Sequence, residues 1–203
     1  GELRMNAPLA GMAWAGETEH RLLTLSTEGR IHVWDLRSRS CPVTAYDTGL
    51  FGAKGLEVTM PHSMVPPYWA IGSSNGIVNM YGGQSTDSAT TSTQLEELLA
   101  APTSASVMDD VRLTARKSLG NLTTATTSMR FSHDAQLLAL ASRNKKDALR
   151  VVHVPSLQAY SNWPTSGTPL GHVTSIDFSS HSEYLAIGNS RGRVLRYSLR
   201  SYL

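Results

Sequence analysis

The sequence predicts an all-β fold built from about four copies of one unit. The clearest copy lies at the C-terminus, where VTSIDFS, YLAIGN and RVLRYSL alternate large apolar residues with small or polar ones. Alternation with a period of two is typical of half-buried strands. The joints between these segments are short and polar, and the second contains Gly192, which suits a tight turn. Residues 171–203 are therefore predicted to form a three-stranded antiparallel meander.

The same unit occurs three more times, at 12–38, 56–83 and 128–156. Its anchor positions are spaced 47, 71 and 45 residues apart, and they are Trp34, Tyr81, Val152 and Tyr197. A repeat of roughly 40–45 residues with four strands per unit is the pattern of a WD-repeat β-propeller. The sequence thus predicts about four blades of such a propeller, whose usual ring has seven.

The expected strands can be placed blade by blade, with the inner strand first. Blade one takes 10–15, 22–26, 30–36 and 42–47; blade two takes 55–60, 69–73, 77–82 and 112–118; blade three takes 126–131, 137–142, 148–154 and 157–162; blade four takes 173–178, 184–188 and 193–199. The outer strand of blade four is missing. Because the chain starts at Gly1 in mid-pattern, we expect further N-terminal blades and a closing strand in the native protein.

A Ser- and Thr-rich insertion at 84–110 interrupts the second blade. Within it, Thr93 to Glu96 fits a capping box that opens a short helix, and Pro102 ends it. Two interpretations remain open: a mobile surface loop, or a segment that docks an apolar stripe on a neighbouring protein. The stripe consists of Leu95, Leu98 and Leu99.

Composition narrows the possible functions. The single cysteine, Cys41, excludes an internal disulfide and a cysteine metal cluster. No apolar run approaches the roughly 20 residues that span a bilayer, so no membrane partner is expected. Charge is uneven: residues 1–111 hold 6 Lys/Arg and 12 Asp/Glu, whereas residues 112–203 hold 12 and 4. This polarity indicates an anionic partner, nucleic acid among them, at the C-terminal side.

The sequence offers no catalytic constellation. Its seven histidines are scattered without the spacing of metal ligands. Ser132, His133 and Asp134 are adjacent in a turn and cannot align as a nucleophile relay, which needs residues that converge in space. A Gly-rich phosphate loop followed by a helix is also lacking. We therefore expect a protein that is not an enzyme and that uses no cofactor or metal.

Basic residues gather in two turns that link second and third strands. The turn SRNKKDALR carries Arg143, Lys145, Lys146 and Arg150, and the equivalent turn of the next blade carries Arg191 and Arg193. Equivalent turns of neighbouring blades project from the same propeller face. These charges are either simply solvated or form a patch that contacts RNA phosphates or an acidic partner.

Arg196 occupies a position where the other blades have Val33, Met80 and Val151. This row faces the space between blades, where a charge is costly unless it is paired or reaches solvent. Arg196 is therefore expected either to face a protein neighbour at the open side of the last blade or to snorkel to water.

Two dipeptides match the structural motif of the WD repeat: Trp34-Asp35 and Gly171-His172. In that repeat a histidine, a strand hydroxyl, a turn aspartate and the tryptophan form a hydrogen-bonded tetrad. No unit of this chain keeps the tetrad whole, so the blades are expected to rely mainly on apolar packing. His172 should find a substitute acceptor, because a buried polar group without a partner costs about 1–3 kcal/mol.

Four segments carry a resemblance to a known family: WDLRSRSC, AIGSSNGIVNMY, TSMRFSHDAQLLALASRNKKDALRVVHVPSLQAYSNWP and HVTSIDFSSHSEYLAIGNSRGRVLRYSL. From about residue 20 onward the chain resembles the C-terminal half of a WD-repeat family of the UTP-B subcomplex of the small-subunit processome. The lengthened turn before ALRVVHVPS and the SNWP after it are its most specific parts. The chain departs from the family in the 84–110 insertion and at Arg196, where the family tends to be apolar.

This resemblance implies a nucleolar, non-catalytic scaffold that helps assemble pre-18S ribosomal RNA with the U3 small nucleolar RNA. Its implied partners are other UTP-B subunits, pre-rRNA and U3 RNA (contacted directly or through those subunits), and the N-terminal part of its own propeller. The alternative is a WD-repeat adaptor in another complex, such as a ubiquitin ligase. A propeller enzyme would need carboxylates or metal ligands around the central channel, and the sequence shows no convergent set.

Overall fold

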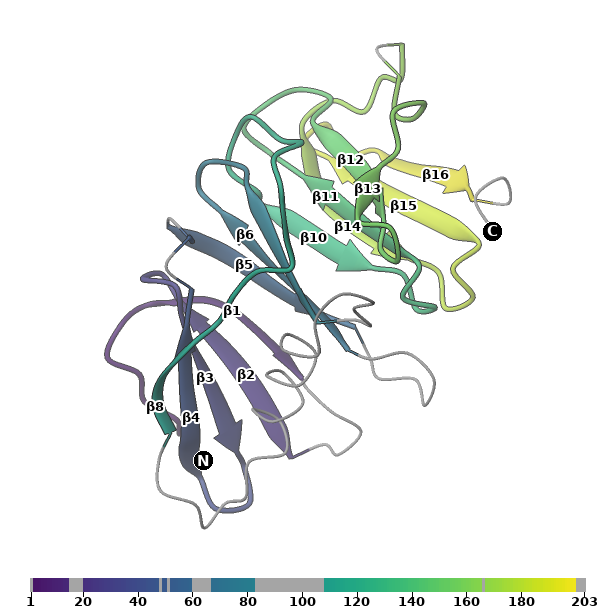
Figure 1. Cartoon of the computed structure of the whole chain (residues 1–203). Helices are drawn as coiled ribbons and strands as arrows, with labels where there is room; N and C mark the ends of the chain where they lie inside the picture. The colour runs from purple at the N-terminus through teal and green to yellow at the C-terminus, as the bar shows by residue number, and fades with distance from the viewer. Residues whose placement is uncertain are drawn as a thin grey trace.

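The computed structural model describes residues 2–14, 20–47, 49–50, 52–59, 67–82, 108–165 and 167–199. These residues form four small sheets and confirm the predicted all-β fold. Figure 1 shows the sheets following one another in chain order, from the N-terminal sheet at lower left to the C-terminal sheet at upper right. Each sheet starts with a strand of alternating sequence, as the period of two predicts.

The first sheet has the order β1-β2-β3-β4-β8, with β1 Leu9–Trp14, β2 Arg21–Ser26, β3 Arg30–Asp35, β4 Ser40–Tyr46 and β8 Met108–Arg112. The second has the order β5-β6-β7-β9, with β5 Ala53–Val58, β6 Tyr68–Ser73, β7 Val78–Gly82 and β9 Lys117–Leu119. The third runs β10 Ser128–Phe131, β11 Leu137–Ala141, β12 Leu149–His153 and β13 Gln158–Ala159. The fourth has β14 Val173–Phe178, β15 Tyr184–Asn189 and β16 Val194–Ser198.

The segment after the insertion differs from the expected single strand at 112–118. It forms two strands that belong to different sheets: β8 pairs in parallel with β4 of the first sheet, and β9 pairs antiparallel with β7 of the second. The outer strand of the third sheet is also shorter than 157–162, because β13 covers only Gln158–Ala159. Leu95, Leu98 and Leu99 lie outside the described residues.

The hydrophobic core is divided among the three spaces between consecutive sheets. Alternate residues of β6 show why: Trp69 and Ile71 pack toward the first sheet, whereas Tyr68 and Ala70 pack toward the third. All six residues of β6 are buried, because both of its faces are covered. A third cluster joins the third and fourth sheets and includes Val151 and Ile187. The sheets therefore stabilise one another by stacking, as blades do.

The large apolar side chains that the structure shows as exposed lie on the first and last strands of this series. Met12 and Trp14 of β1 are 64% and 54% exposed, and Val194 of β16 is 76% exposed. Exposure alternates along β16, so that Val194, Arg196 and Ser198 lie on one face and are all exposed. The outer faces of the first and last sheets thus expose more apolar surface to solvent than the faces of the two middle sheets.

Candidate functional site

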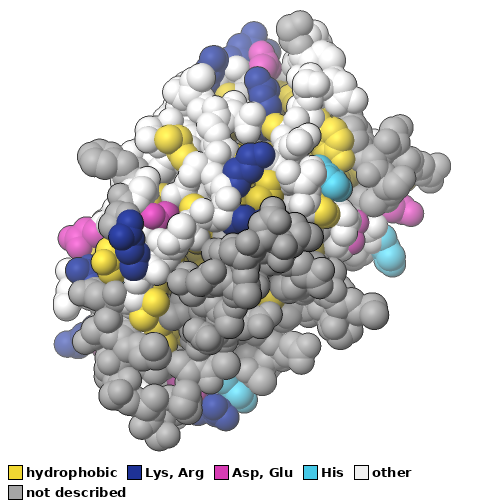
Figure 2. All heavy atoms as spheres, in the orientation of Figure 1, with side chains coloured by type: hydrophobic (Ala, Val, Ile, Leu, Met, Phe, Trp, Pro, Cys, Tyr) yellow, Lys and Arg dark blue, Asp and Glu magenta, His cyan; other side chains and the backbone are white. Residues whose placement is uncertain are grey.

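The basic residues predicted from the sequence lie in two exposed turns. Arg143, Lys145 and Lys146 are exposed in the turn between β11 and β12, and Arg191 and Arg193 are exposed in the turn between β15 and β16. We call these five side chains the basic turn surface. Figure 2 shows Lys and Arg side chains at the upper edge of the molecule, over the two C-terminal sheets.

The Gly171-His172 dipeptide joins the two turns through its own backbone and ring. The His172 Nδ1 lies 3.0 Å from the Arg143 carbonyl oxygen, and the Ser190 N–H donates to the His172 carbonyl oxygen at 2.9 Å. Asp147 makes two contacts with Gly171: its N–H donates to the Gly171 carbonyl at 2.8 Å, and its carboxylate accepts from the Gly171 N–H at 2.7 Å. His172 therefore has a hydrogen-bond acceptor, the Arg143 carbonyl oxygen, which belongs to the turn of the preceding blade and not to its own blade.

Each turn is also fixed by hydrogen bonds from its backbone N–H groups to a nearby side chain. In the first, the Arg143 N–H donates to the Thr127 hydroxyl at 2.8 Å. In the second, the Asn189 side-chain oxygen accepts from the N–H groups of Arg191 and Arg193 at 3.0 and 3.1 Å, while its amide donates to the Leu170 carbonyl. These bonds fix the backbones that carry the charges, so the spacing of the two turns is a property of the fold.

Arg150 does not share the environment of the turn residues. It lies within β12, opposite Leu140, with a half-buried side chain that donates to the Leu149 carbonyl at 2.7 Å. Arg196 of β16 is exposed, and its guanidinium lies 4.8 Å from the centroid of the Tyr184 ring on β15. This cation–π contact satisfies the charge at the open face of the last sheet.

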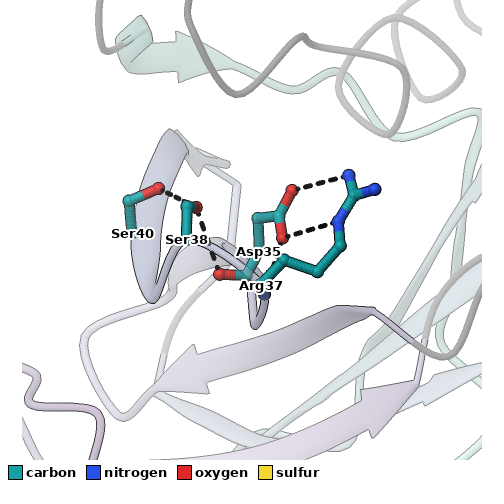
Figure 3. Close-up of polar contacts among 4 residues, drawn as sticks. All are labelled: Asp35, Arg37, Ser38 and Ser40. Atoms are coloured by element: carbon teal, nitrogen blue, oxygen red, sulfur yellow. Dashed lines mark hydrogen bonds and ion pairs between the residues drawn. The ribbon is translucent and has the colours of Figure 1, made fainter.

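The Trp34-Asp35 dipeptide is structural. The Trp34 indole N–H donates to the Thr24 hydroxyl on β2 at 2.8 Å, so this blade keeps one bond of the WD tetrad. The fully buried Asp35 carboxylate accepts from the Arg37 backbone N–H at 2.9 Å. It also pairs with the Arg37 guanidinium at 3.2 Å, as Figure 3 shows. The Ser38 hydroxyl, also drawn there, bonds the Asp35 carbonyl and closes the turn into β4.

A polar network that the sequence analysis missed joins the first two sheets; its Asn79 and Tyr81 are buried and its Asp47 is half-buried. Asp47, just after β4, accepts from the Tyr81 hydroxyl at 2.5 Å and from the Asn79 amide at 2.7 Å. The Asn79 oxygen in turn accepts from the Ser118 hydroxyl at 2.7 Å. Burial, followed by the nearby carboxylate, raises the pKa of Tyr81 and keeps its hydroxyl a donor. The second blade is thus not held by apolar packing alone.

The inner strands of all four sheets line one open pocket, as expected for the axis of a propeller. Its walls come from β1, β5, β10 and β14 together with the residues that lead into β10. Arg130 of β10 and Glu57 of β5 line this pocket, and Arg130 pairs with Glu57 at 3.1 Å and with Asp177 of β14 at 3.4 Å. Two carboxylates therefore do converge near the axis, contrary to the sequence analysis, with an arginine between them.

A signal for this cluster is present in the sequence. The three inner strands each carry one charged residue between two apolar ones, in LEV at 56–58, MRF at 129–131 and IDF at 176–178. Equivalent residues of neighbouring inner strands lie side by side around the axis of a propeller. Aligning the repeats on the inner strand, instead of on the third strand, would have placed the three charges together.

Replacing Arg130 by methionine should lower stability by about 1–3 kcal/mol at neutral pH, because it leaves the mostly buried Glu57 carboxylate without its cation. Burial already raises the Glu57 pKa, and Arg130 opposes that shift. Without Arg130 the folded-state pKa rises further, so the folded chain takes up a proton more readily than the unfolded chain as pH falls. The loss should therefore shrink toward about pH 5, measured by urea unfolding.

The double variant Arg130→Met with Glu57→Gln is the control. It removes the carboxylate that the arginine neutralises, so its stability should recover and should not improve specifically in acid. An Arg130→Met loss that is equal at both pH values would contradict a role for Glu57.

Among the described residues, no group of three or more His, Cys, Asp or Glu side chains is placed to hold a metal ion. In the same part of the chain, no helix has the length and apolar character needed to cross a membrane.

Comparison with known proteins gives one consistent result. The chain is 31% identical over 202 residues to the U3 small nucleolar RNA-associated protein 18 homolog of Arabidopsis thaliana, covering 100% of the chain and 32% of that protein. It is 32% identical over 203 residues to the Mus musculus homolog, again covering 32% of it. The Saccharomyces cerevisiae protein of that name is 43% identical over 133 residues, 66% of the chain and 19% of the protein.

No family model matches the chain. Among solved structures, the crystal structure of the computationally designed Ika4 protein has a TM-score of 0.62 at 14% identity, and the match covers 97% of this chain and 95% of the designed one. This likeness concerns the fold alone. The chain spans about a third of the length of its plant and mouse relatives. With four stacked β-sheets and 31–43% identity to these proteins, the chain is homologous to a segment of the U3 small nucleolar RNA-associated protein 18 family.

Proposed function

We propose that this chain is part of a non-catalytic scaffold subunit that acts with the U3 small nucleolar RNA in the small-subunit processome. There it would support processing of pre-18S ribosomal RNA and assembly of the small ribosomal subunit in the nucleolus. Its neighbours would be other subunits of the UTP-B subcomplex, together with the remainder of its own propeller.

The observation that carries this proposal is the 31–32% identity that extends along the whole chain to proteins named for association with U3 RNA. The fold is compatible with it. Stacked sheets hold each blade rigid through three buried clusters, while the turns between strands remain free to meet partners. A scaffold needs such fixed surfaces and needs no reactive group.

Immunoprecipitation of the tagged, intact protein from cells of its own organism tests the proposal. U3 RNA should be enriched over a spliceosomal small RNA of similar abundance, and other processome subunits should be recovered with it. Depletion of the protein should cause unprocessed precursors of 18S ribosomal RNA to accumulate, measured by northern blotting.

Two results would contradict the proposal. One is recovery of the protein without U3 RNA and with unchanged 18S precursors on depletion. The other is co-purification with a cullin adaptor, which would favour a WD-repeat substrate receptor of a ubiquitin ligase. The variant Trp34→Ala shows how loss of folding alone affects the recovery of U3 RNA. It removes a buried indole and its bond to Thr24 but leaves the two basic turns unchanged.

A further inference from the structure

We propose that the basic turn surface binds the phosphate backbone of double-stranded RNA directly. This inference deepens the proposed function and rests on it for the source of the RNA, because a scaffold in the processome could equally meet RNA only through other subunits. The surface itself is argued from the charges, the backbone bonds and the composition of the two turns.

The five cations of this surface are not neutralised by the protein. None of Arg143, Lys145, Lys146, Arg191 and Arg193 forms an ion pair with an acidic side chain in the part of the chain that the structure describes. The nearest acidic residue along the chain, Asp147, uses its carboxylate to accept from the Gly171 N–H at 2.7 Å. The turns thus present positive charge to solvent, which is what a polyanion requires.

The two turns are organised before any ligand arrives. His172 bonds the first turn through the Arg143 carbonyl and the second through the Ser190 N–H. Thr127 and Asn189 hold the same turns from behind. Because the backbones are already fixed, binding an extended anion orders only the side-chain ends, which reduces the entropic cost. Cations on two linked turns also suit a ligand whose negative charges repeat along a line.

The composition of the turns favours RNA over an acidic peptide. Residues 143–146 and 190–193 read RNKK and SRGR, which contain no apolar or aromatic side chain; the exposed apolar residue beside them is a single one, Val194 at the start of β16. Protein partners are usually anchored by buried aromatic or aliphatic residues, whereas phosphate contacts need only charge and hydrogen-bond donors. Single-stranded RNA is typically held by stacking on aromatic rings, which these turns lack. The remaining ligand is the backbone of a duplex, recognised by shape and charge.

The charge distribution of the chain orients such a ligand. Residues 1–111 carry 12 acidic and 6 basic side chains and residues 112–203 carry 4 and 12. A polyanion is therefore attracted more strongly by the C-terminal part of the sequence, which contains the basic turn surface, than by residues 1–111. Since the deep, narrow major groove of an RNA duplex keeps side chains from reading its base edges, we expect binding that depends strongly on salt and weakly on RNA sequence.

Fluorescence anisotropy with the purified chain and a labelled RNA hairpin of about 20 base pairs tests the inference. Affinity should fall by roughly 10²- to 10³-fold between about 50 and 200 mM KCl if all five cations contact phosphates. The variant Lys145→Ser, Lys146→Ser, Arg191→Ser, Arg193→Ser should bind at least about 100-fold more weakly at low salt. Its salt slope should be smaller by about three to four.

The matched control removes four other exposed positive charges, which lie in or beside the first two sheets: Arg4→Ser, Arg39→Ser, Lys54→Ser and Lys117→Ser. This variant should keep most of the affinity and the slope. Both variants should melt at the wild-type temperature, which excludes unfolding as the cause. A second hairpin of unrelated sequence should bind equally well.

Three outcomes would overturn the inference: an unchanged affinity and slope in the turn variant, equal losses in both variants, or displacement of RNA by a poly-glutamate peptide that binds more tightly than RNA. Failure here and failure of the proposed function are distinguishable. U3 RNA that co-purifies from cells while the purified chain binds no hairpin removes only this inference. A chain that binds hairpins but recovers no U3 RNA removes only the proposed function.

Discussion

Replacing Asp47 by alanine should lower the free energy of unfolding by about 3 kcal/mol. Asp47 accepts from the Tyr81 hydroxyl and the Asn79 amide, and these two side chains are 0% and 2% exposed. The substitution leaves two buried donors without an acceptor, and each such group costs about 1–3 kcal/mol. It also separates the end of the first sheet from β7 of the second. Urea unfolding followed by circular dichroism measures the loss.

A double-mutant cycle with Tyr81→Phe isolates the hydrogen bond. In the Tyr81→Phe background the hydroxyl is already absent, so Asp47→Ala should cost less than it does in the wild type, with a coupling of about 0.5–3 kcal/mol. Additive losses would mean that Asp47 and Tyr81 do not act together. The variant Thr27→Ala, at an exposed turn position of the same sheet, should change stability by less than about 0.5 kcal/mol.

This network shows where sequence reasoning was insufficient. The change from tryptophan to Tyr81 at the anchor position was interpreted as the loss of a hydrogen-bonded tetrad. The structure replaces that tetrad with another donor and with an acceptor from the preceding blade, 34 residues away. Pairings over such distances depend on how two sheets stack. A pattern within one repeat carries no information about that stacking.

The strands themselves were predictable because alternation is a local signal. It fails after the insertion, where Met108–Arg112 adds to the first sheet and Lys117–Leu119 to the second. The two strands read MDDVR and KSL, which are too short and too polar to show an alternating apolar pattern. The parallel pairing of β8 with β4 also requires a crossover connection, which turn residues in the sequence do not indicate. The single strand expected at 112–118 combined the last residue of β8 with the first two residues of β9.

The candidate site was predictable to the extent that it lies in turns. Turns between equivalent strands of neighbouring blades project together, so Lys145 and Arg191 could be grouped without coordinates. Arg150, which was grouped with them, lies in β12 instead of the turn and has a half-buried side chain. Nor could sequence show that Gly171 and His172 link the two turns, since those bonds use backbone atoms.

Two glycines in equivalent turns provide a sharper test of how the second and third sheets fit together. Gly76 and Gly192 each follow a polar pair in the turn after the second strand of a blade, with φ of +86° and +71°. An alanine in this left-handed region costs about 1–2 kcal/mol at either position. Their surroundings differ. A Cβ on Gly76 would lie 2.6 Å from the carbonyl oxygens of Leu122 and Thr124, whereas a Cβ on Gly192 meets nothing within 4 Å.

Gly76→Ala should therefore cost about 3 kcal/mol or more, and Gly192→Ala about 1 kcal/mol, because only the first adds a clash with backbone that cannot rotate away. Relief requires the segment before β10 to move. That segment supplies the Thr127 hydroxyl that accepts from the Arg143 N–H, so Gly76→Ala should also weaken RNA binding at the basic turns from a distance. Thermal unfolding and the hairpin assay measure the two effects. Equal stability losses at the two glycines would show that the segment 122–127 does not press on the Gly76 turn.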